Sequence, residues 1–221
     1  QDFRFDALVM LGPPVPEPLM AGKMPLVTVG WHVDHPSVDV VRTCDESGAI
    51  QAVTHLVSLG HRRIAHLDGG SGLIAASRRE AYMHAMRHQG LESDIRILPG
   101  GETQLAGQRA TQKMLQDDEL PTAIVAYNDD EAVAAMGVLM QHGIEVPGQV
   151  SVIGWDDSEV ARLSSVDLTS IAQNPHEMAR LAIERIVARV EGPGIVDREI
   201  TLEPELKIRS STASSPTVPL S

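Results

Sequence analysis

Polar and aromatic side chains recur along this chain directly after short apolar runs. Carboxylate and amide oxygens accept hydrogen bonds from hydroxyl groups, and an aromatic ring covers the apolar face of a sugar, so these residue types together suit a small polyhydroxylated ligand. Aspartate and asparagine at such points also serve as helix N-caps. Spacing leaves both interpretations open, and one residue can serve both roles. The set consists of Gly30-Trp31, Asp68, Tyr127, Asn128-Asp129, Trp155 and Asp156.

Arg78 follows the run that ends at Asp68, and we expect it at the start of a helix over 77–88. The helix dipole disfavours a cation at that end, so the position favours a functional reason for the arginine. Its forked guanidinium can donate hydrogen bonds to a hydroxyl, a carboxylate or a ring nitrogen of a ligand. The alternative is a surface ion pair with Glu80 or Asp129.

Other chemistries have little support in the sequence. His32 and His35 are three residues apart, but the segment WHVDHP lacks the ligand pattern of a metalloprotease, so we expect no metal site. The segment GGSG at 69–72 is too short for a dinucleotide fingerprint. No base stands beside Cys44, and helix caps explain acidic pairs such as Asp156-Asp157 more simply than catalysis does. We therefore expect no cofactor and no enzymatic activity.

Composition narrows the class of protein. The 221 residues contain 18 Lys and Arg against 30 Asp and Glu, and the net charge of −12 makes this stretch ill-suited to hold nucleic acid by itself. The single cysteine cannot form an internal disulfide. No apolar run approaches the roughly 20 residues that span a bilayer, so we expect no membrane partner.

Apolar runs alternate with helical periodicities, which predicts a parallel β-sheet covered by helices on both faces. Ligands bind such sheets beyond the carboxyl ends of the strands, where the polar and aromatic set lies. The predicted strands are 7–11, 26–29, 38–41, 64–67, 95–98, 123–127, 150–155, 168–171, 199–202 and 206–208. The predicted helices are 46–59, 77–88, 104–116, 129–141 and 175–191, with Asp45, Asn128 and Asn174 as N-caps. The tail from 210, rich in Ser, Thr and Pro, is expected to be disordered.

Five segments occur in the order and spacing typical of one known family. They are HLVSLGHRRIAHLDG, SRREAYMHAM, LPTAIVAYNDDEAVAAMGVLMQHGIEVPGQVSVIGWDDSEVA, LTSIAQNPHEMARLAIERI and LEPELKIRSST. Over residues 7–212 the chain resembles the effector-binding core of the lactose/galactose repressor family.

The resemblance implies an α/β fold of the periplasmic-binding-protein type I. In this fold two doubly wound parallel-sheet subdomains are joined by three crossovers, here near 42–45, 170–173 and 203–205, and the effector binds in the cleft between them. Residues 1–45 and 171–204 would form the N-terminal subdomain, incomplete as it stands. Residues 46–170 and 205–211 would form the C-terminal subdomain, followed by a disordered tail over 212–221. Family members start with a helix-turn-helix headpiece and two further strand–helix units, so we expect the natural protein to be longer.

The resemblance also implies ligand-binding residues. Arg78 matches the effector-binding arginine of the family, although Ala81 replaces the usual glycine nearby. Asn128 matches the cleft asparagine of the ND motif, and Asp156 matches the cleft aspartate of the motif GWDD. Gln173 occupies a polar crossover position from which it can reach a ligand.

Three further residues complete the predicted site. Glu102 stands where some members place an aromatic residue that stacks on the effector, so its acid indicates hydroxyl or amine recognition instead. Gly30 stands where sugar-binding members keep an aspartate, which makes Trp31 the expected contact from that strand. Trp155 precedes Asp156 and is expected at the same rim.

The function implied by the resemblance is that of the effector-binding and dimerisation region of a bacterial transcriptional regulator, usually a repressor. Such a protein is a cytoplasmic homodimer that senses a small metabolite, here most simply a sugar, and changes its affinity for operator DNA allosterically. The DNA would be bound by a headpiece absent from this chain. The alternative function is that of a sugar-binding protein of an ABC transporter.

Overall fold

The structure is a computed structural model that describes residues 5–12, 15–22, 24–192 and 197–216. The chain folds into two compact units. Unit 1 comprises Gln1–Cys44 and Asn174–Glu203, and unit 2 comprises Asp45–Gln173 and Pro204–Ser221. The chain therefore passes between the units three times, at or next to the crossovers expected from the resemblance.

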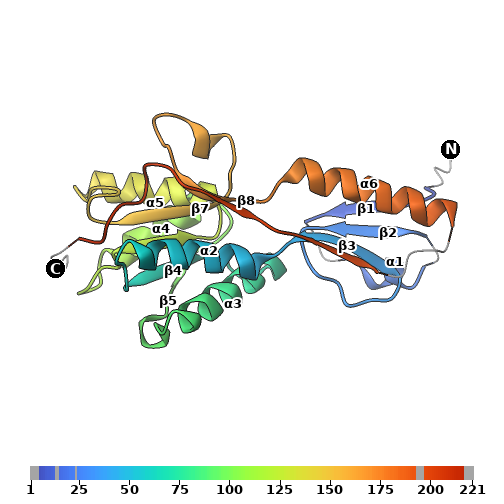
Figure 1. Cartoon of the computed structure of the whole chain (residues 1–221), viewed down its shortest axis with the longest axis horizontal. Helices are drawn as coiled ribbons and strands as arrows, with labels where there is room; N and C mark the ends of the chain where they lie inside the picture. The colour runs from blue at the N-terminus through green and yellow to red at the C-terminus, as the bar shows by residue number, and fades with distance from the viewer. Residues whose placement is uncertain (1–4, 13–14, 23, 193–196, 217–221) are drawn as a thin grey trace. The chain divides into compact units, whose positions relative to one another are not determined.

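Unit 2 is built on a six-stranded sheet with the strand order β10-β8-β7-β6-β4-β5 (Figure 1). Neighbouring strands are parallel except for β10, which runs antiparallel to β8. The central strands are continuous apolar runs because both faces of a parallel sheet are covered. The strands are β4 (Ile64–Asp68), β5 (Arg96–Pro99), β6 (Ala123–Ala126), β7 (Ser151–Asp156), β8 (Thr169–Ala172) and β10 (Glu205–Lys207).

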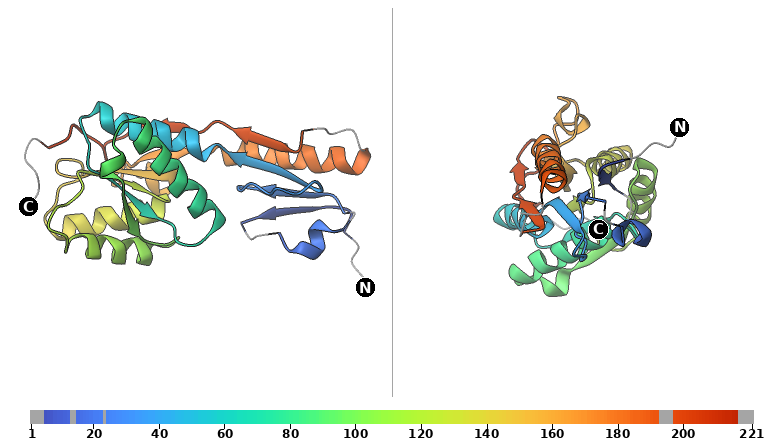
Figure 2. Two further views of the ribbon diagram at one scale, coloured as in Figure 1. Left: turned by 90° about the horizontal axis from the view of Figure 1, so that it is seen from below. Right: turned by 90° about the vertical axis from the view of Figure 1, so that its right-hand side faces the viewer.

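Helices cover both faces of this sheet, as the alternation of strands and helices predicts (Figure 2). Helices α2 (Asp45–Ser58) and α3 (Leu73–His88) enclose a core that contains Leu56 and Met86. Helices α4 (Gln104–Met114) and α5 (Asp129–Gln141) enclose a second core that contains Met114 and Leu139. Short 3-10 turns η1 (Glu92–Asp94) and η2 (Val160–Arg162) complete the unit. Because α3, α4 and α5 each follow a parallel strand of this sheet, their amino ends point to its carboxyl edge.

Unit 1 has a four-stranded parallel sheet with the order β1-β2-β3-β9. Helix α6 (Pro175–Glu191) packs Met178, Ala182 and Ile186 against the β2 and β3 side chains. Asp39 on β3 is buried and receives two hydrogen bonds from Arg189, at 2.5 and 2.7 Å, which tie the end of α6 to the sheet. The remaining elements are β1 (Leu8–Leu11), the short helix α1 (Glu17–Met20), β2 (Leu26–Val29), β3 (Val38–Thr43) and β9 (Glu199–Leu202).

Local sequence signals account for most of these elements, with two corrections. The Asn128 and Asn174 caps are confirmed, since each side chain accepts a hydrogen bond from the third residue of its helix. Helix α3 begins at Leu73, one turn earlier than expected, so Arg78 lies in its second turn and the dipole argument for it loses force. The expected Asp45 cap is wrong. Asp45 is the first residue of α2, and its carboxylate accepts a hydrogen bond from Ser77 at 2.6 Å.

The C-terminal segment also differs from the expectation of a disordered tail. Ser211 is buried, and its hydroxyl donates to Val152 at 2.6 Å. Beyond it, the backbone nitrogen of Ala213 donates to the Ser151 hydroxyl at 3.1 Å, and that of Ser215 donates to Leu59 at 2.8 Å. Residues 211–215 therefore pack on unit 2, while 217–221 lie outside the described residues.

Within the described part of the chain, no helix combines the length and the apolar character needed to cross a bilayer.

Candidate functional site

The Arg78 guanidinium lies between two aromatic rings at the carboxyl edge of the unit 2 sheet. Its Cζ atom is 4.9 Å from the centre of the Tyr127 ring and 4.6 Å from that of Trp155, within the range of cation–π attraction. Nη1 donates a hydrogen bond to the Tyr127 carbonyl oxygen at 2.5 Å. The side chain is only 5% exposed. The alternative of a surface ion pair with Glu80 or Asp129 is therefore wrong.

Two glycines leave the space that the Trp155 and Tyr127 rings occupy. A Cβ atom at Gly48 on α2 would lie 2.6 Å from the Trp155 ring, closer than van der Waals contact allows. A Cβ atom at Gly69, directly after β4, would collide with the Tyr127 ring. Each ring therefore lies against bare backbone on one side. This close approach holds the two rings in the positions from which they contact Arg78.

Two carboxylates flank the guanidinium without forming hydrogen bonds of normal length to it. Asp45 Oδ1 is 3.6 Å from Arg78 Nε, and Asp156 Oδ1 is 3.5 Å from Arg78 Nη2. Nε is consequently buried without a hydrogen-bond partner. Asp45 is buried, whereas 40% of the Asp156 side chain is exposed, and Gln173 Nε2 donates to Asp156 Oδ1. Asp156 is thus the acceptor of this cluster that solvent or a ligand can reach.

The Asp156 carboxyl titrates near neutral pH. Burial raises its pKa to about 6, while the positive charge of Arg78 acts in the opposite direction. The nearby negative charge of Asp129 adds to the rise. Above this pH the group is a charged acceptor suited to ligand hydroxyl or amine donors.

The backbone that carries Asp156 is strained. Asp156 has φ of 113° and Asp157 has φ of 48°. A non-glycine residue with positive φ is uncommon, and it persists where surrounding contacts over-determine it, which is most often at functional sites.

Asn128 and Glu102 form a second cluster at the same edge. The Asn128 side chain caps α5 by accepting from Glu131 N at 2.8 Å, and its Nδ2 donates to the Glu102 carbonyl oxygen at 3.0 Å. The loop before α4 is held further by Glu131, whose Oε1 accepts from Gly101 N at 2.9 Å. The Glu102 side chain is exposed. Both polar groups of Asn128 therefore already have partners within the protein.

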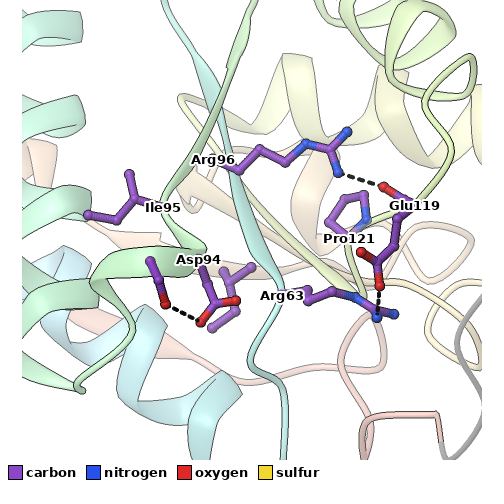
Figure 3. Close-up of a pocket in the computed structure, with 8 residues that line it drawn as sticks. Arg63, Asp94, Ile95, Arg96, Glu119 and Pro121 are labelled. Carbon is purple, nitrogen blue, oxygen red and sulfur yellow. Dashed lines mark hydrogen bonds and ion pairs between the residues drawn. The ribbon is translucent and has the colours of Figure 1, made fainter.

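A pocket of about 250 Å³ lies at the opposite, amino-terminal edge of the sheet (Figure 3). Arg63 and Arg96 line it, and both contact Glu119: Arg63 through the carboxylate, and Arg96 through the carbonyl oxygen at 2.8 Å. Arg96 also pairs with Asp117. The two arginines of this pocket are thus paired with groups of the protein, although Arg63 Nε is buried without a hydrogen-bond partner. Among the residues the structure describes, no group of three or more His, Cys, Asp and Glu could hold a metal.

Comparison with known proteins identifies the family. A family model for the periplasmic binding protein-like domain matches residues 53–212. The crystal structure of a LacI transcriptional regulator from a Rhodococcus species is 33% identical, covers 96% of this chain and 80% of that one, and superposes with a TM-score of 0.90. The chain belongs to the LacI family.

The chain spans different shares of two other relatives. The HTH-type transcriptional repressor PurR of Aliivibrio salmonicida is 28% identical over 215 residues, which cover 94% of this chain and 65% of the repressor. The chain thus spans less than two thirds of the length of this curated relative. A LacI family transcriptional regulator from Enterococcus faecium, with bound ribose, is 26% identical with a TM-score of 0.80, covering 87% of this chain and 72% of that one.

The predicted site residues of this LacI-family chain divide into three groups. Arg78, Asp156, Gln173 and Trp155 lie together in unit 2, and Asn128 and Glu102 contact each other at the same edge. Trp155 is only 2% exposed, so it holds Arg78, and its contact with a ligand stays a prediction. Trp31 belongs to unit 1, where it is 4% exposed, and its ligand contact also stays a prediction.

Two residues of the edge differ from the sequence prediction. Asp45 was expected only as a cap, yet it flanks Arg78. Tyr127 belonged to the polar and aromatic set but not to the predicted site, and its ring covers Arg78. The sequence feature that could have indicated the position of Tyr127 is the glycine at position 69, which leaves room for the Tyr127 ring. The other tyrosine, Tyr82 on α3, lies in the core of unit 2, where its hydroxyl donates to the Ile64 carbonyl oxygen at 2.7 Å.

Proposed function

We propose that this chain is the effector-binding part of a bacterial transcriptional repressor and that it binds a small polyhydroxylated metabolite, a sugar or a related compound. One observation carries the proposal. Arg78 is fixed between two rings at the carboxyl edge of the sheet, with the partly exposed Asp156 carboxylate beside it. Function in such folds resides at this edge rather than in the fold itself.

The chemistry of the edge favours a donor-rich ligand. Arg78 has one bond to Tyr127 and two carboxylates nearby, so its charge is already compensated. Asp156 then offers acceptor oxygens, and Gln173 offers an amide that both donates and accepts. Hydroxyl groups of a sugar match these acceptors, and the exposed Glu102 adds another carboxylate. The relative from Enterococcus faecium, with bound ribose, supports this class of ligand.

The regulatory part of the proposal follows from thermodynamic coupling. An effector changes operator affinity only as far as it binds one conformation of the protein better than another. The repressor PurR and the LacI regulators among the relatives support this function. We propose a cytoplasmic homodimer in which a headpiece outside this chain binds operator DNA.

Regulation is favoured over the two alternatives. The relatives are named as transcriptional regulators, which supports a regulator over a sugar-binding protein of an ABC transporter. The same relatives favour a binding protein over an enzyme. We therefore assign Arg78 and Asp156 to ligand binding rather than to catalysis.

The test starts with a thermal-shift screen of sugars, nucleosides and amino acids, followed by calorimetric titration of the best compound. Asp156→Ala removes an acceptor and should weaken binding about 10- to 100-fold, the effect of losing one or two hydrogen bonds to a charged group. Arg78→Ala should weaken it at least as much. Asp130→Asn is the matched control, because Asp130 is exposed and bonds only to Gln104 among its recorded partners.

Two results would contradict the proposal. Unchanged affinity in both the Arg78 and the Asp156 variants would place the ligand elsewhere. A compound that binds and is chemically converted would make the protein an enzyme.

A further inference from the structure

The backbone at the end of β7 is strained, so other contacts of the protein must stabilise its conformation. Asp156 and Asp157 are consecutive residues with positive φ, and neither is a glycine. Such a backbone relaxes to ordinary angles unless contacts on the following residues prevent it. The contacts that hold residues 157 and 158 therefore determine where the Asp156 carboxylate lies.

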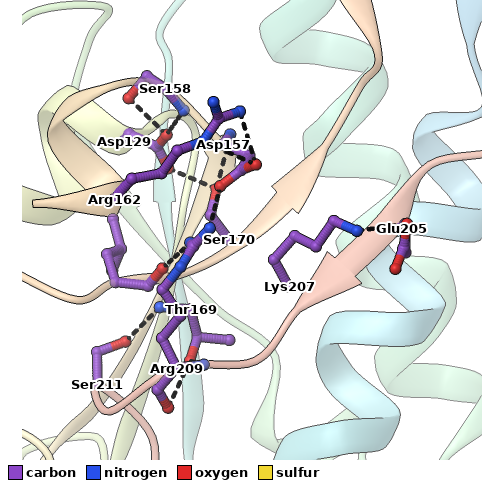
Figure 4. A network of polar contacts seen from close by, with 11 residues as sticks. Asp129, Asp157, Ser158, Arg162, Thr169, Ser170, Glu205, Lys207, Arg209 and Ser211 are labelled. Atoms are coloured by element: carbon purple, nitrogen blue, oxygen red, sulfur yellow. Dashed lines mark hydrogen bonds and ion pairs between the residues drawn. The ribbon is translucent and has the colours of Figure 1, made fainter.

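Asp129, directly and through Ser170, supplies the contacts of the Ser158 and Asp157 backbone nitrogens, while Arg162 and Arg209 hold the Asp157 side chain (Figure 4). Its Oδ2 atom accepts two hydrogen bonds from Ser158, one from the backbone nitrogen and one from the hydroxyl, both at 2.7 Å. Its Oδ1 atom accepts from the Ser170 hydroxyl at 2.6 Å. The Ser170 oxygen in turn accepts from the backbone nitrogen of Asp157 at 3.0 Å. One carboxylate thus joins the segment after β7 to strand β8.

The position of Asp129 is itself closely determined. The residue is 2% exposed. A Cβ atom at Gly154 would collide with Asp129 Oδ1, so the carboxylate lies against the bare backbone of β7 two residues before Asp156. Its two oxygens bond to residues outside α5, which distinguishes Asp129 from a first-turn acid that merely interacts with the helix dipole.

We propose that Asp129 is a positioning residue which, through Ser158 and Ser170, holds the strained backbone at Asp156 and so fixes its carboxylate beside Arg78. The inference deepens the proposed function and rests on it, because it takes Asp156 as the ligand acceptor. Asp129 does not touch the ligand. It acts through two serines on the residue that does.

The first test compares crystal structures of Asp129→Asn and Asp130→Asn. Both variants lose one negative charge at the start of α5, but only the first changes the network. In Asp129→Asn an amide NH2 replaces one oxygen, so the side chain can no longer accept from both Ser158 and Ser170. With the NH2 towards Ser170, that hydroxyl must accept instead of donate, and its own hydrogen loses its partner. We expect the Asp156 carboxylate to move by more than about 1 Å relative to Arg78, a displacement large enough to impair a site. The control should superpose on the wild type.

The serines provide a milder test that keeps the charge constant, and they replace Asp129→Asn if that variant does not fold. Ser158→Ala removes one hydroxyl from the network, and Ser158→Thr restores it. The readout is the pH midpoint of tryptophan emission, restricted to the transition that Asp156→Asn abolishes. Ser158→Ala should shift this midpoint by more than about 0.5 pH unit, because burial of the carboxylate and its distance to Arg78 together set it, and Ser158→Thr should return it.

An Asp156 carboxylate that superposes on the wild type in every variant, with an unchanged midpoint, overturns the inference. Neither measurement needs an effector, so this failure is distinct from failure of the proposed function. The proposed function fails when a compound binds with the same affinity to the Arg78 and Asp156 variants as to the wild type, whatever the effect of the Asp129 substitution.

Discussion

Asp156 and Asp157 are neighbours at the end of β7, yet their carboxylates meet arginines in different ways. Asp157 Oδ2 accepts from Arg162 at 2.8 and 3.1 Å, and Asp157 Oδ1 accepts from Arg209. Asp156 lies 3.5 Å from Arg78, whose Nη1 already bonds to a carbonyl. Burial acts to raise the pKa of Asp157, but hydrogen bonds from the two arginines outweigh it and leave the pKa lowered. At Asp156 burial prevails and raises the pKa to about 6.

The difference shows that a carboxylate near an arginine does not always stabilise the fold; it does so when the arginine donates hydrogen bonds to it. Asp157 is 8% exposed and saturated with donors, so it stabilises the fold and has little left for a ligand. Asp156 is partly exposed and has unused acceptor capacity, so it costs stability when ionised and remains available. Under the proposed function, stability and binding are therefore divided between two adjacent residues of the motif GWDD.

The largest expected effect concerns Glu131. Like Asp156 it has a raised pKa, but unlike Asp156 it is fully buried. Burial raises the pKa of Glu131 from 4.5 to about 8. The folded state therefore holds this proton more tightly than the unfolded chain, and the resulting stability is complete below pH 4.5 and lost as pH rises towards 8. Glu131→Gln keeps an acceptor for Gly101 and cannot ionise. Urea denaturation at pH 9 should show the variant more stable by about 5 kcal/mol.

Near pH 4.5 the Glu131→Gln variant and the wild type should be almost equally stable. A variant less stable than the wild type at pH 9 would mean that Glu131 is already ionised and well paired in the folded protein.

The second effect tests whether the Asp157 carboxylate stabilises the fold. Asp157→Asn removes a buried charge and leaves a single uncharged oxygen as the acceptor for Arg209 and Arg162, so the free energy of unfolding at pH 7 should fall by about 2 kcal/mol. Because the pKa of Asp157 is lowered, its stabilisation is present above its usual pKa and is lost as pH falls through the folded value. The deficit of the variant should therefore shrink at pH 3. A constant deficit would indicate packing rather than charge.

Asp156→Asn is the matched variant and should have a smaller effect, within about 1 kcal/mol of the wild type at pH 7, because asparagine tolerates positive φ well. The raised pKa of Asp156 means that its contribution to stability is full below its usual pKa and declines as pH rises towards 6. The variant should lack this decline. Thermal unfolding between pH 4 and 7 measures it, and a loss as large as that of Asp157→Asn would contradict the division of roles.

The smallest effect is expected for Arg162→Ala. The Arg162 side chain is 60% exposed, so water screens its pair with Asp157, while Arg209 remains in place. Calorimetry should show a decrease in Tm below about 2 °C. Arg209→Ala should lower Tm further, because Arg209 is only 18% exposed and also donates to Leu168 at 2.5 Å.

The sequence predicts much of the fold through local signals. Helix α5 has the predicted bounds because Asn128 caps it and Gly143, with φ of 74°, follows its end. The start of α3 was misplaced because Gly72 precedes it without a side-chain cap. The end of the chain was misjudged from composition, since the hydroxyl groups that suggest disorder here bond to strands. Ser211, for example, donates to the Val152 carbonyl oxygen on β7 at 2.6 Å.

The candidate site was predictable only where a motif or strand end marks it. Arg78 and Asp156 were found in this way, and the structure brings them together. The Asp45 contact depends on the packing of α2 against α3, which no spacing in the sequence reveals. The same holds for Asp129, whose partners at 158 and 170 lie on other segments.

The bare backbone beneath the two rings also bears on how such a protein could change its ligand over generations. At positions 48 and 69 any larger residue displaces a ring, and either ring carries the guanidinium with it. An alanine at either position would shift a ring and so change the position of the Arg78 guanidinium, while the residues proposed to contact the ligand stay the same. Directed evolution of a biosensor from this scaffold should therefore diversify these two positions alongside the residues at the rim.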